Sequence, residues 1–203
     1  MSMDKTFVLA SNNAHKLREF RQIFDRLGLR VLSMAEAGVA VEPEENGKTF
    51  AENAMIKAKA VFELCHKPTV ADDSGLCVDA LDGAPGIYSA RFGGRPTDES
   101  RRALLFEKLA DIPAEKRGAH FVSAIACVMN EDEQFTVEGY CYGSIAFEEA
   151  GEGGFGYDCM FIPNDRGGKT FAELSPEDKN SISHRADALE KFAQKMERDY
   201  DNR

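Results

Sequence analysis

The chain has 203 residues, 43% of them hydrophobic, which is enough for one sizeable core and predicts a single domain over residues 1–203. Charged residues make up 30% of the chain and its net charge is -10, which argues against general affinity for nucleic acid or for anionic membranes. No apolar run approaches the roughly 20 residues of a membrane span, and the N-terminus has no signal-peptide pattern, so we expect a cytoplasmic protein.

The cysteines are widely spaced, odd in number and without a CxxC pair. This usage predicts reduced thiols in a core, rather than disulfides or a zinc site. They are Cys65, Cys77, Cys127, Cys141 and Cys159.

The first predicted elements are a short apolar strand, Thr6–Ala10, a polar loop, Ser11–Lys16, and a helix that ends at Gly28. Backbone amides at the start of such a helix suit phosphate. Lys16 adds a cation to the first turn, which is unfavourable there unless an anion lies nearby. The alternative is an ordinary turn in which Asn12 and Asn13 are turn residues, and this segment alone leaves both open.

An acidic loop, Glu42–Lys48, then leads into a helix with a predicted capping box at Thr49–Glu52. Glu44 and Glu45 are either solvated loop charges or, if the loop folds beside Asp73, metal ligands.

The spacing of Lys57 and Lys59 on this second helix prevents them from sharing a face, so at most one of them points into a cleft. The apolar face of the helix consists of Phe50, Ala54, Ala58, Val61 and Cys65.

Two adjacent carboxylates, Asp72 and Asp73, lie between the extended segments Thr69–Ala71 and Leu76–Val78. Side chains alternate in an extended chain, so the two should point in opposite directions. One can then face a cleft while the other braces the backbone or a neighbouring cation. A half-buried acidic pair is costly without a cation, and the alternative is a polar capped turn.

Further along, a loop with two arginines, Ile87–Arg95, precedes a helix that Thr97 or Asp98 caps. Two long β runs follow, His120–Met129 and Phe135–Phe147, joined by a polar hairpin turn. The length of these runs suggests strands that extend toward a partner interface.

Glycines flank two aromatic residues in the loop Glu152–Asp158, just before a strand at Met160–Pro163. An exposed Phe155 could stack on a base, because glycines let the backbone approach a ligand. The alternative is a flexible turn in which Phe155 fills the core.

Ser175–Asp178 is a helix start, with a cap, a proline and acids in the first turn, and we expect one helix to continue from it. Lys179, His184 and Arg185 gather positive charge in this acidic chain. A solvated helix face would explain Lys179 and Arg185, whereas His184 favours contact with an anion or a flat ring.

These parts together are those needed to hold a nucleoside triphosphate with a divalent metal: a phosphate-type loop with a lysine, a carboxylate pair, an aromatic loop and a basic cluster. Taken by themselves, these residues indicate phosphate-ester chemistry, and they leave open which phosphorus is attacked.

The same segments resemble, in order and over roughly the whole chain, the motifs of the inosine triphosphate pyrophosphatase family, the Ham1-like or RdgB-like non-canonical purine NTP pyrophosphatases. Asp72–Arg91 and Phe155–Asp158 are the most specific blocks. The matching motifs are Ser11–Lys16, Ala71–Leu76, Gly83–Arg91, Gly154–Asp158 and Ser183–Arg185.

The resemblance implies Mg²⁺-dependent hydrolysis of ITP, dITP and XTP to the nucleoside monophosphate and pyrophosphate, which clears deaminated purines from the nucleotide pool. It implies an α/β fold in which an elongated, twisted mixed β-sheet with flanking helices forms two lobes around a nucleotide-binding cleft. It also implies a homodimer.

The resemblance further implies that Asp73 is the general base and a metal ligand, and that Glu44 or Glu45 completes the metal site. Lys57 is a weaker candidate for phosphate. Base recognition falls mainly to Phe155 and the pair of His184 and Arg185. The implied substrate-binding residues are Ser11, Asn12, Asn13, Ala14, His15, Lys16, Ser74, Phe155, Gly156, Tyr157, Asp158, Lys179, His184 and Arg185.

The chain departs from the family pattern at two positions. Asn12 stands where the first loop of the family usually has glycine, and asparagine tolerates positive φ well. Cys159 stands where proline often follows the Phe-Gly-Tyr-Asp motif, which bears on the rigidity of that loop.

Two rival interpretations are a Maf-like pyrophosphatase for pyrimidine or modified nucleotides and a nucleotide-binding sensor that does not hydrolyse its ligand. The intact pair of Asp72 and Asp73 argues against the sensor, because a sensor needs no general base.

Overall fold

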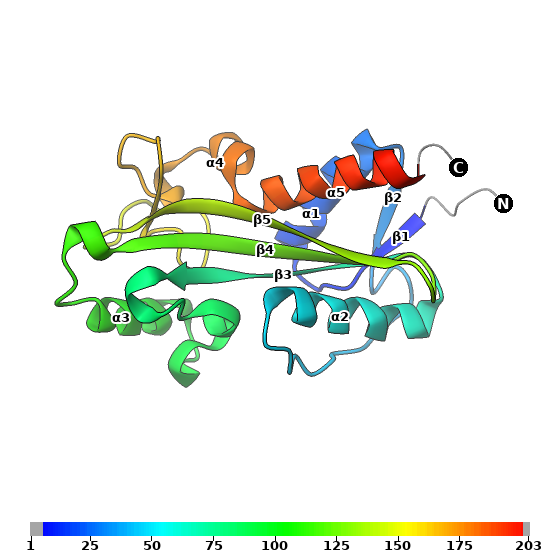
Figure 1. Ribbon diagram of the computed structural model, residues 1–203, viewed down its shortest axis with the longest axis horizontal. Helices are drawn as coiled ribbons and strands as arrows, with labels where there is room; N and C mark the ends of the chain where they lie inside the picture. The colour runs from blue at the N-terminus through cyan, green and yellow to red at the C-terminus, as the bar shows by residue number, and fades with distance from the viewer. Residues whose placement is uncertain (1–5, 201–203) are drawn as a thin grey trace. The chain divides into compact units, whose positions relative to one another are not determined.

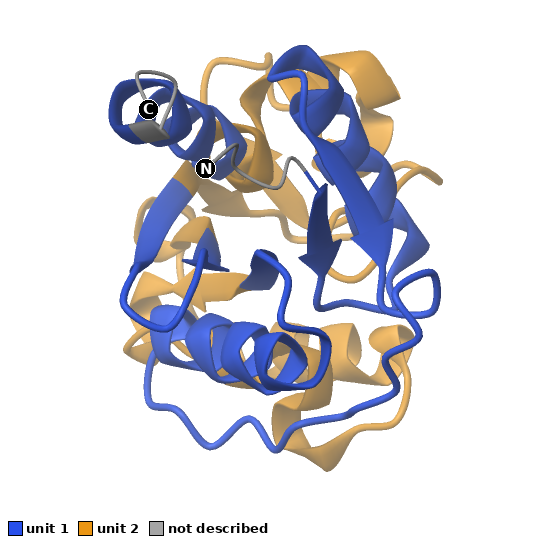
Figure 2. Ribbon diagram, turned by 90° about the vertical axis from the view of Figure 1, so that its right-hand side faces the viewer, with its two compact units in different colours: residues 1–73, 123–139, 188–203 blue, residues 74–122, 140–187 orange. Residues whose placement is uncertain are grey.

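The computed structural model describes residues 6–200 (Figure 1). Within them the chain forms two compact units (Figure 2). Unit 1 contains the chain up to Asp73, Ser123–Gly139 and the chain from Ala188 onward, and unit 2 contains Ser74–Val122 and Tyr140–Asp187. No helix among the described residues is long and apolar enough to cross a membrane.

Six strands form one mixed sheet in the order β2-β1-β3-β4-β5-β6. Strand β1 pairs in parallel with β2 and β3, whereas β5 and β6 are antiparallel. The α/β class and the mixed sheet with flanking helices are therefore confirmed. The strands are β1 (Thr6–Leu9), β2 (Arg30–Ser33), β3 (Thr69–Val78), β4 (Gly118–Val128), β5 (Gln134–Ile145) and β6 (Phe161–Pro163).

The helices follow the predicted order, with one exception at Ser183. They are α1 (Ala14–Arg26), α2 (Phe50–Cys65), α3 (Asp98–Lys108), α4 (Pro176–Ile182) and α5 (His184–Tyr200), and short 3₁₀ segments include η2 (Gly86–Gly94) and η4 (Phe171–Glu173). The single helix expected from Ser175 onward is wrong, because Ser183 is extended (φ -69°, ψ 153°) and separates α4 from α5. The Ser183 side chain accepts a hydrogen bond from the amide of Ala186 and so caps α5.

In unit 1, α1 and α5 lie on one side of the strands and α2 lies on the other (Figure 1). Phe20 and Phe24 of α1 pack in a fully buried core, where the Phe24 ring stacks on Phe192 of α5 at 5.3 Å. The core also takes Phe7 from β1 and Val70 from β3. Burial of these apolar faces fixes both helices against β1 and against β3, the strand that carries the acidic pair.

In unit 2, α3 and the strands enclose a second core. Leu105 and Leu109 are fully buried, and Phe121 packs edge-on against Phe161 at 4.8 Å between ring centroids. Thr97 caps α3 through a capping box with Ser100. Helix α3 is therefore anchored at its start and along its apolar face.

All five cysteines are free. Cys127 and Cys141 are buried, and the other three are partly exposed. Burial raises the pKa of Cys77 to about 11, so that thiol stays protonated at neutral pH.

Candidate active site

The loop between β1 and α1 belongs to unit 1 and leads from a strand that is in parallel register with β3. Asn13 caps α1, because its side chain accepts hydrogen bonds from the amides of His15 (2.8 Å) and Lys16 (3.2 Å). Asn13 therefore serves as a turn residue, and two of the amides expected to face phosphate are already paired. Ala14 is the exposed first residue of the helix.

Ser11 and Asn12 complete this loop. Ser11 Oγ accepts a hydrogen bond from the amide of Asn13 at 3.1 Å. Asn12 is exposed and is not among the described residues that have positive φ. The loop thus forms its turn without the conformational freedom that a glycine would bring.

Lys16 reaches from α1 to the first acid of the pair, which is 1% exposed. Its Nζ lies 2.7 Å from Asp72 Oδ2 and also donates a hydrogen bond to the main-chain oxygen of Asp72 at 3.1 Å. Ser123, fully buried on β4, donates a hydrogen bond to the other carboxylate oxygen, Oδ1. Both oxygens of Asp72 are therefore occupied by protein groups, and Asp72 acts as a fixed counter-ion for Lys16.

Asp73 pairs with α2, on the opposite face of β3, as the alternation of side chains predicted. Its Oδ1 accepts a hydrogen bond from Lys57 Nζ at 2.9 Å, and Glu45 Oε1 lies 3.3 Å from the same nitrogen. Asp73 Oδ2 is buried and has no hydrogen-bond partner among the described residues. Unlike Asp72, Asp73 therefore keeps one oxygen for a ligand or a proton.

Burial raises the pKa of Asp73 above its ordinary value, because desolvation outweighs the attraction of Lys57. The charge of Glu45 adds to this rise, and Lys16 opposes it. Burial alone would lower the pKa of Lys57, but Asp73 and Glu45 raise it further than burial lowers it. Lys57 therefore stays protonated beside a carboxylate that is easier to protonate than usual.

The structure distinguishes Glu45 from its neighbour. Glu45 is partly buried beside Lys57, whereas Glu44 is exposed and has no ion pair among the described residues. The sequence made both glutamates candidate metal ligands only if the acidic loop folds beside Asp73. Glu45 alone meets that condition.

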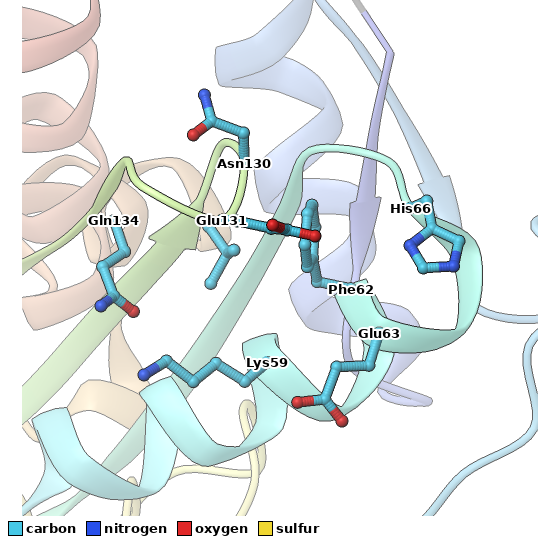
Figure 3. A pocket seen from close by; sticks show the side chains of 8 residues that line it. Lys59, Phe62, Glu63, His66, Asn130, Glu131 and Gln134 are labelled. Carbon is cyan, nitrogen blue, oxygen red and sulfur yellow. The ribbon is translucent and has the colours of Figure 1, made fainter.

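The two lysines of α2 point to different places, as their spacing predicted. Lys57 faces Asp73, whereas Lys59 lines a hollow of about 400 Å³ (Figure 3). None of the predicted site residues lines this hollow. Its lining consists of Lys59, Phe62, Glu63, His66, Val128, Asn130, Glu131 and Gln134.

In unit 2, the aromatic loop presents one ring and buries the other. Phe155 is 47% exposed, so the alternative in which it fills the core is wrong, and Tyr157 is the aromatic residue that does so at 6% exposure. Burial raises the pKa of Tyr157 to about 12, and its hydroxyl donates a hydrogen bond to the main-chain oxygen of Ser89 at 2.9 Å. Lys179 Nζ lies 2.6 Å from Asp158 Oδ2 and 4.9 Å from the centroid of the Phe155 ring.

His184 and Arg185 are both buried at the start of α5. The His184 ring stacks on Phe121 at 4.8 Å between centroids. Arg185 is 4% exposed and donates a hydrogen bond to Ser74 Oγ at 3.2 Å, so a solvated helix face does not explain it. Unit 2 thus brings together Ser74 and Arg185, and separately Phe155, Asp158 and Lys179.

Residues 7–195 match the model of the Ham1 family. This chain belongs to the Ham1 family. It is 45% identical to the dITP/XTP pyrophosphatase of Bacillus subtilis over 198 residues, which cover 97% of this chain and 100% of that protein. It is 46% identical to the dITP/XTP pyrophosphatase of Geobacillus kaustophilus over 194 residues, or 95% of each chain.

Solved structures of Ham1 proteins share this fold. The Ham1 protein of Staphylococcus aureus superposes with a TM-score of 0.87 at 39% identity, covering 95% of this chain and 98% of that one. The HAM1 protein of Coxiella burnetii gives 0.86 at 39% identity, with 93% and 96% covered. The resemblance drawn from the sequence motifs is confirmed.

The carboxylates of this Ham1 chain fit a magnesium ion in one respect. Within residues 6–200, no three His, Cys, Asp or Glu side chains gather closely enough to hold a metal ion by themselves. Mg²⁺, however, is often bound by one or two carboxylates together with water and substrate phosphates. The unpaired Oδ2 of Asp73 and the neighbouring Glu45 meet that smaller requirement.

Several predicted site residues are held by partners that the sequence did not indicate. Ser123 fixes Asp72, and Ser89 fixes Tyr157. Asp98 and Arg102 of α3 contact the main chain of Gly156. No local pattern marks these partners, because each lies more than 45 residues away in the sequence from the group it contacts.

Proposed function

We propose that this protein hydrolyses the non-canonical purine nucleoside triphosphates ITP, dITP and XTP to the monophosphate and pyrophosphate, and so clears deaminated purines from the nucleotide pool. The observation that carries the proposal is the carboxylate of Asp73, buried with one free oxygen beside Lys57. Relatives with about the same length and 45–46% identity are dITP/XTP pyrophosphatases.

The residues of unit 1 are assigned to the triphosphate. Lys16 and Lys57 supply positive charge for phosphate oxygens, and Ser11 supplies a hydroxyl. Asp72 and Ser123 hold Lys16 in place, so its position does not have to be fixed on binding.

We assign the general base to Asp73. It takes a proton from a water molecule as the water oxygen bonds to the α-phosphorus, and the bond from that phosphorus to the bridging oxygen breaks to release pyrophosphate. The raised pKa of Asp73 makes its carboxylate a better proton acceptor than an ordinary one. Asp72 cannot share this role, because both of its oxygens are already paired.

Asp73 and Glu45 are the proposed ligands of Mg²⁺. The ion, when bound, would neutralise charge on the phosphate oxygens and on the departing pyrophosphate. Lys57, between the two carboxylates, keeps them from repelling each other before the ion arrives.

The residues of unit 2 are assigned to the nucleoside. Phe155 offers an exposed ring for stacking on the base, and the pair of His184 and Arg185 offers donors for the purine 6-oxo group. Adenine would set its 6-amino group against those donors and leave a buried polar contact unpaired, which disfavours it. Asp158 and Lys179 support the loop that carries Phe155. We also propose a single functional domain, a homodimer and a cytoplasmic location.

The proposal is tested by incubating the protein with ITP, dITP, XTP, dUTP and dTTP in the presence of Mg²⁺ and by identifying the products. We expect the purine substrates to give monophosphate and pyrophosphate. Faster turnover of dUTP or dTTP would favour a Maf-like enzyme instead, and binding of ITP without turnover would favour a sensor.

The pH profile of Lys57→Met should differ from that of the wild type. Lys57 lowers the pKa of Asp73, so its removal should raise that pKa and move the acidic limb of kcat/KM to higher pH. Lys59→Met is the matched control, because Lys59 is on the same helix and faces the hollow. Equal limbs in the two variants would contradict the assignment of Asp73 as the base.

Substitution of the two glutamates of the acidic loop should have different effects on the Mg²⁺ concentration that the reaction requires. Glu45→Gln removes a proposed ligand, so the Mg²⁺ concentration for half-maximal rate should rise by about 10-fold or more, within the range for metal-site contacts. Glu44→Gln should change it less than twofold, because Glu44 is exposed and outside the cluster. Titration of the rate with MgCl₂ at saturating ITP measures both, and a reversed order would assign the site to Glu44.

A further inference from the structure

Helix α3 holds both main-chain polar groups of a single residue, Gly156, in the aromatic loop. The amide of Gly156 donates a hydrogen bond to Asp98 Oδ2 at 3.1 Å, and the oxygen of Gly156 accepts one from Arg102 Nη1 at 3.0 Å. Asp98 and Arg102 are four residues apart and so lie on one face of the helix. We call this pair of contacts the α3 clamp.

The clamp is itself fixed in unit 2. Arg102 Nε donates a hydrogen bond to Glu149 Oε1 at 2.7 Å, which holds the guanidinium in place, and the Arg102 side chain is only 17% exposed. Arg101 forms an ion pair with Asp98 from the same helix. Since α3 is anchored by Leu105 in the core, the clamp ties a surface loop to a rigid element.

The other side of Phe155 is also restrained. The Phe155 amide donates a hydrogen bond to Asp158 Oδ2 at 2.8 Å, and a Cβ on Gly154 would lie 2.1 Å from the same oxygen. Tyr157, on the far side of Gly156, is buried. Phe155 is thus an exposed ring on a backbone that is held on both sides, which is unusual for a glycine-rich loop.

We infer that Asp98 and Arg102 are positioning residues that hold the Phe155 ring ready to stack on the substrate base. The inference rests on the proposed function, in which Phe155 contacts the base. A ring that is already placed binds without the entropy cost of ordering the loop. The reaction occurs at a phosphorus far from the base, so stacking of the base on Phe155 contributes equally to binding of the substrate and of the transition state. Loss of the clamp should therefore raise KM and leave kcat unchanged.

The test compares Arg102→Met, which keeps the length of the side chain and removes its donors, with Lys108→Met, an exposed control on the same helix. With ITP as substrate, Arg102→Met should raise KM by about 3–10-fold, which is the size of effect that the loss of one or two hydrogen bonds produces. The kcat should stay within twofold of wild type. Lys108→Met should change neither.

Asp98→Ala and Asp98→Asn provide a second pair, should Arg102→Met fold poorly. Alanine removes the acceptor for the Gly156 amide and should raise KM, whereas asparagine keeps an acceptor oxygen and should recover most of the loss. Recovery by asparagine separates a positioning contact from a general effect of charge.

A double-variant cycle shows whether the clamp acts through Phe155. In a Phe155→Ala background, Arg102→Met should raise KM less than twofold further, because the ring that the clamp positions is gone. Full additivity would overturn the inference, as would an unchanged KM in both Arg102→Met and Asp98→Ala. If the wild type itself turns over no purine triphosphate, the proposed function fails and the inference fails with it. If the wild type is active and KM is unmoved, the inference alone fails.

Discussion

Asp73→Asn is expected to lower kcat for ITP by about 10²–10⁴-fold, the usual contribution of a positioned general base. Asparagine has nearly the same shape and can still accept the hydrogen bond from Lys57, so the fold should be retained. It cannot take a proton from water, and it removes a negative charge from the proposed Mg²⁺ site. The loss should therefore appear in kcat at saturating ITP and MgCl₂.

Release of pyrophosphate from ITP measures this effect, with thermal unfolding as a check on the fold. Asp111→Asn is the matched control, because Asp111 is an exposed aspartate outside both groups of site residues, and it should keep wild-type kcat. Full activity of Asp73→Asn would remove Asp73 from the mechanism. Release of orthophosphate in place of pyrophosphate by the wild type would contradict attack at the α-phosphorus.

Asp72→Ala should destabilise the fold more than any other substitution proposed for this protein. The Asp72 carboxylate is fully buried between Lys16 and Ser123, and its removal takes the counter-ion from a largely buried ammonium and the acceptor from a buried hydroxyl. Breaking a buried pair in this way typically costs about 3–5 kcal/mol. For a chain of this size, each kcal/mol lowers Tm by roughly 2–4 °C. We therefore expect a fall in Tm of about 6–20 °C at pH 7.

Glu190→Gln is a suitable comparison, because it breaks an exposed ion pair with Arg26 at 3.7 Å and should cost about 0–1 kcal/mol. Asp72→Asn keeps an acceptor for Ser123 and should fall between the two. Thermal unfolding followed by circular dichroism gives the Tm of all three. A loss for Asp72→Ala as small as that for Glu190→Gln would show that Lys16 finds another counter-ion and that Asp72 does not hold it.

Several features of the site follow from local chemistry and were predictable from the sequence. Alternation along an extended segment predicted that Asp72 and Asp73 would face opposite sides, and β3 places them against Lys16 and Lys57 respectively. Helical spacing predicted that only one of Lys57 and Lys59 could serve the site. The order of the motifs was sufficient to assign the family, which the comparisons confirm.

The expectation of a single helix from Ser175 onward was wrong for a reason that is also local in the sequence. The division between α4 and α5 depends on Ser183, whose side chain caps the second helix. A serine just before an acid-containing first turn is a helix-start signal, and it was present in the sequence. Helical periodicity concealed the break, because it does not reveal a single extended residue between two helices.

The sequence by itself determined the residue types of the candidate site, most of the strands, helices and loops that carry them, and the family. The residue pattern presented Asp72 and Asp73 as equals, and only the family resemblance implied that Asp73 is the base. The pattern also left open the choices between Glu44 and Glu45 and between a stacking and a buried Phe155. Tertiary structure distinguished Asp72 from Asp73 and Glu44 from Glu45 by their contacts, and it showed Phe155 to be exposed. Sequence could not, because burial and hydrogen-bond partners depend on segments that are distant in sequence. Ser123 on β4 occupies one acid, and no described residue occupies the free oxygen of the other. The packing that brings β4 to β3, and α3 to the aromatic loop, has no periodic signature in either segment alone.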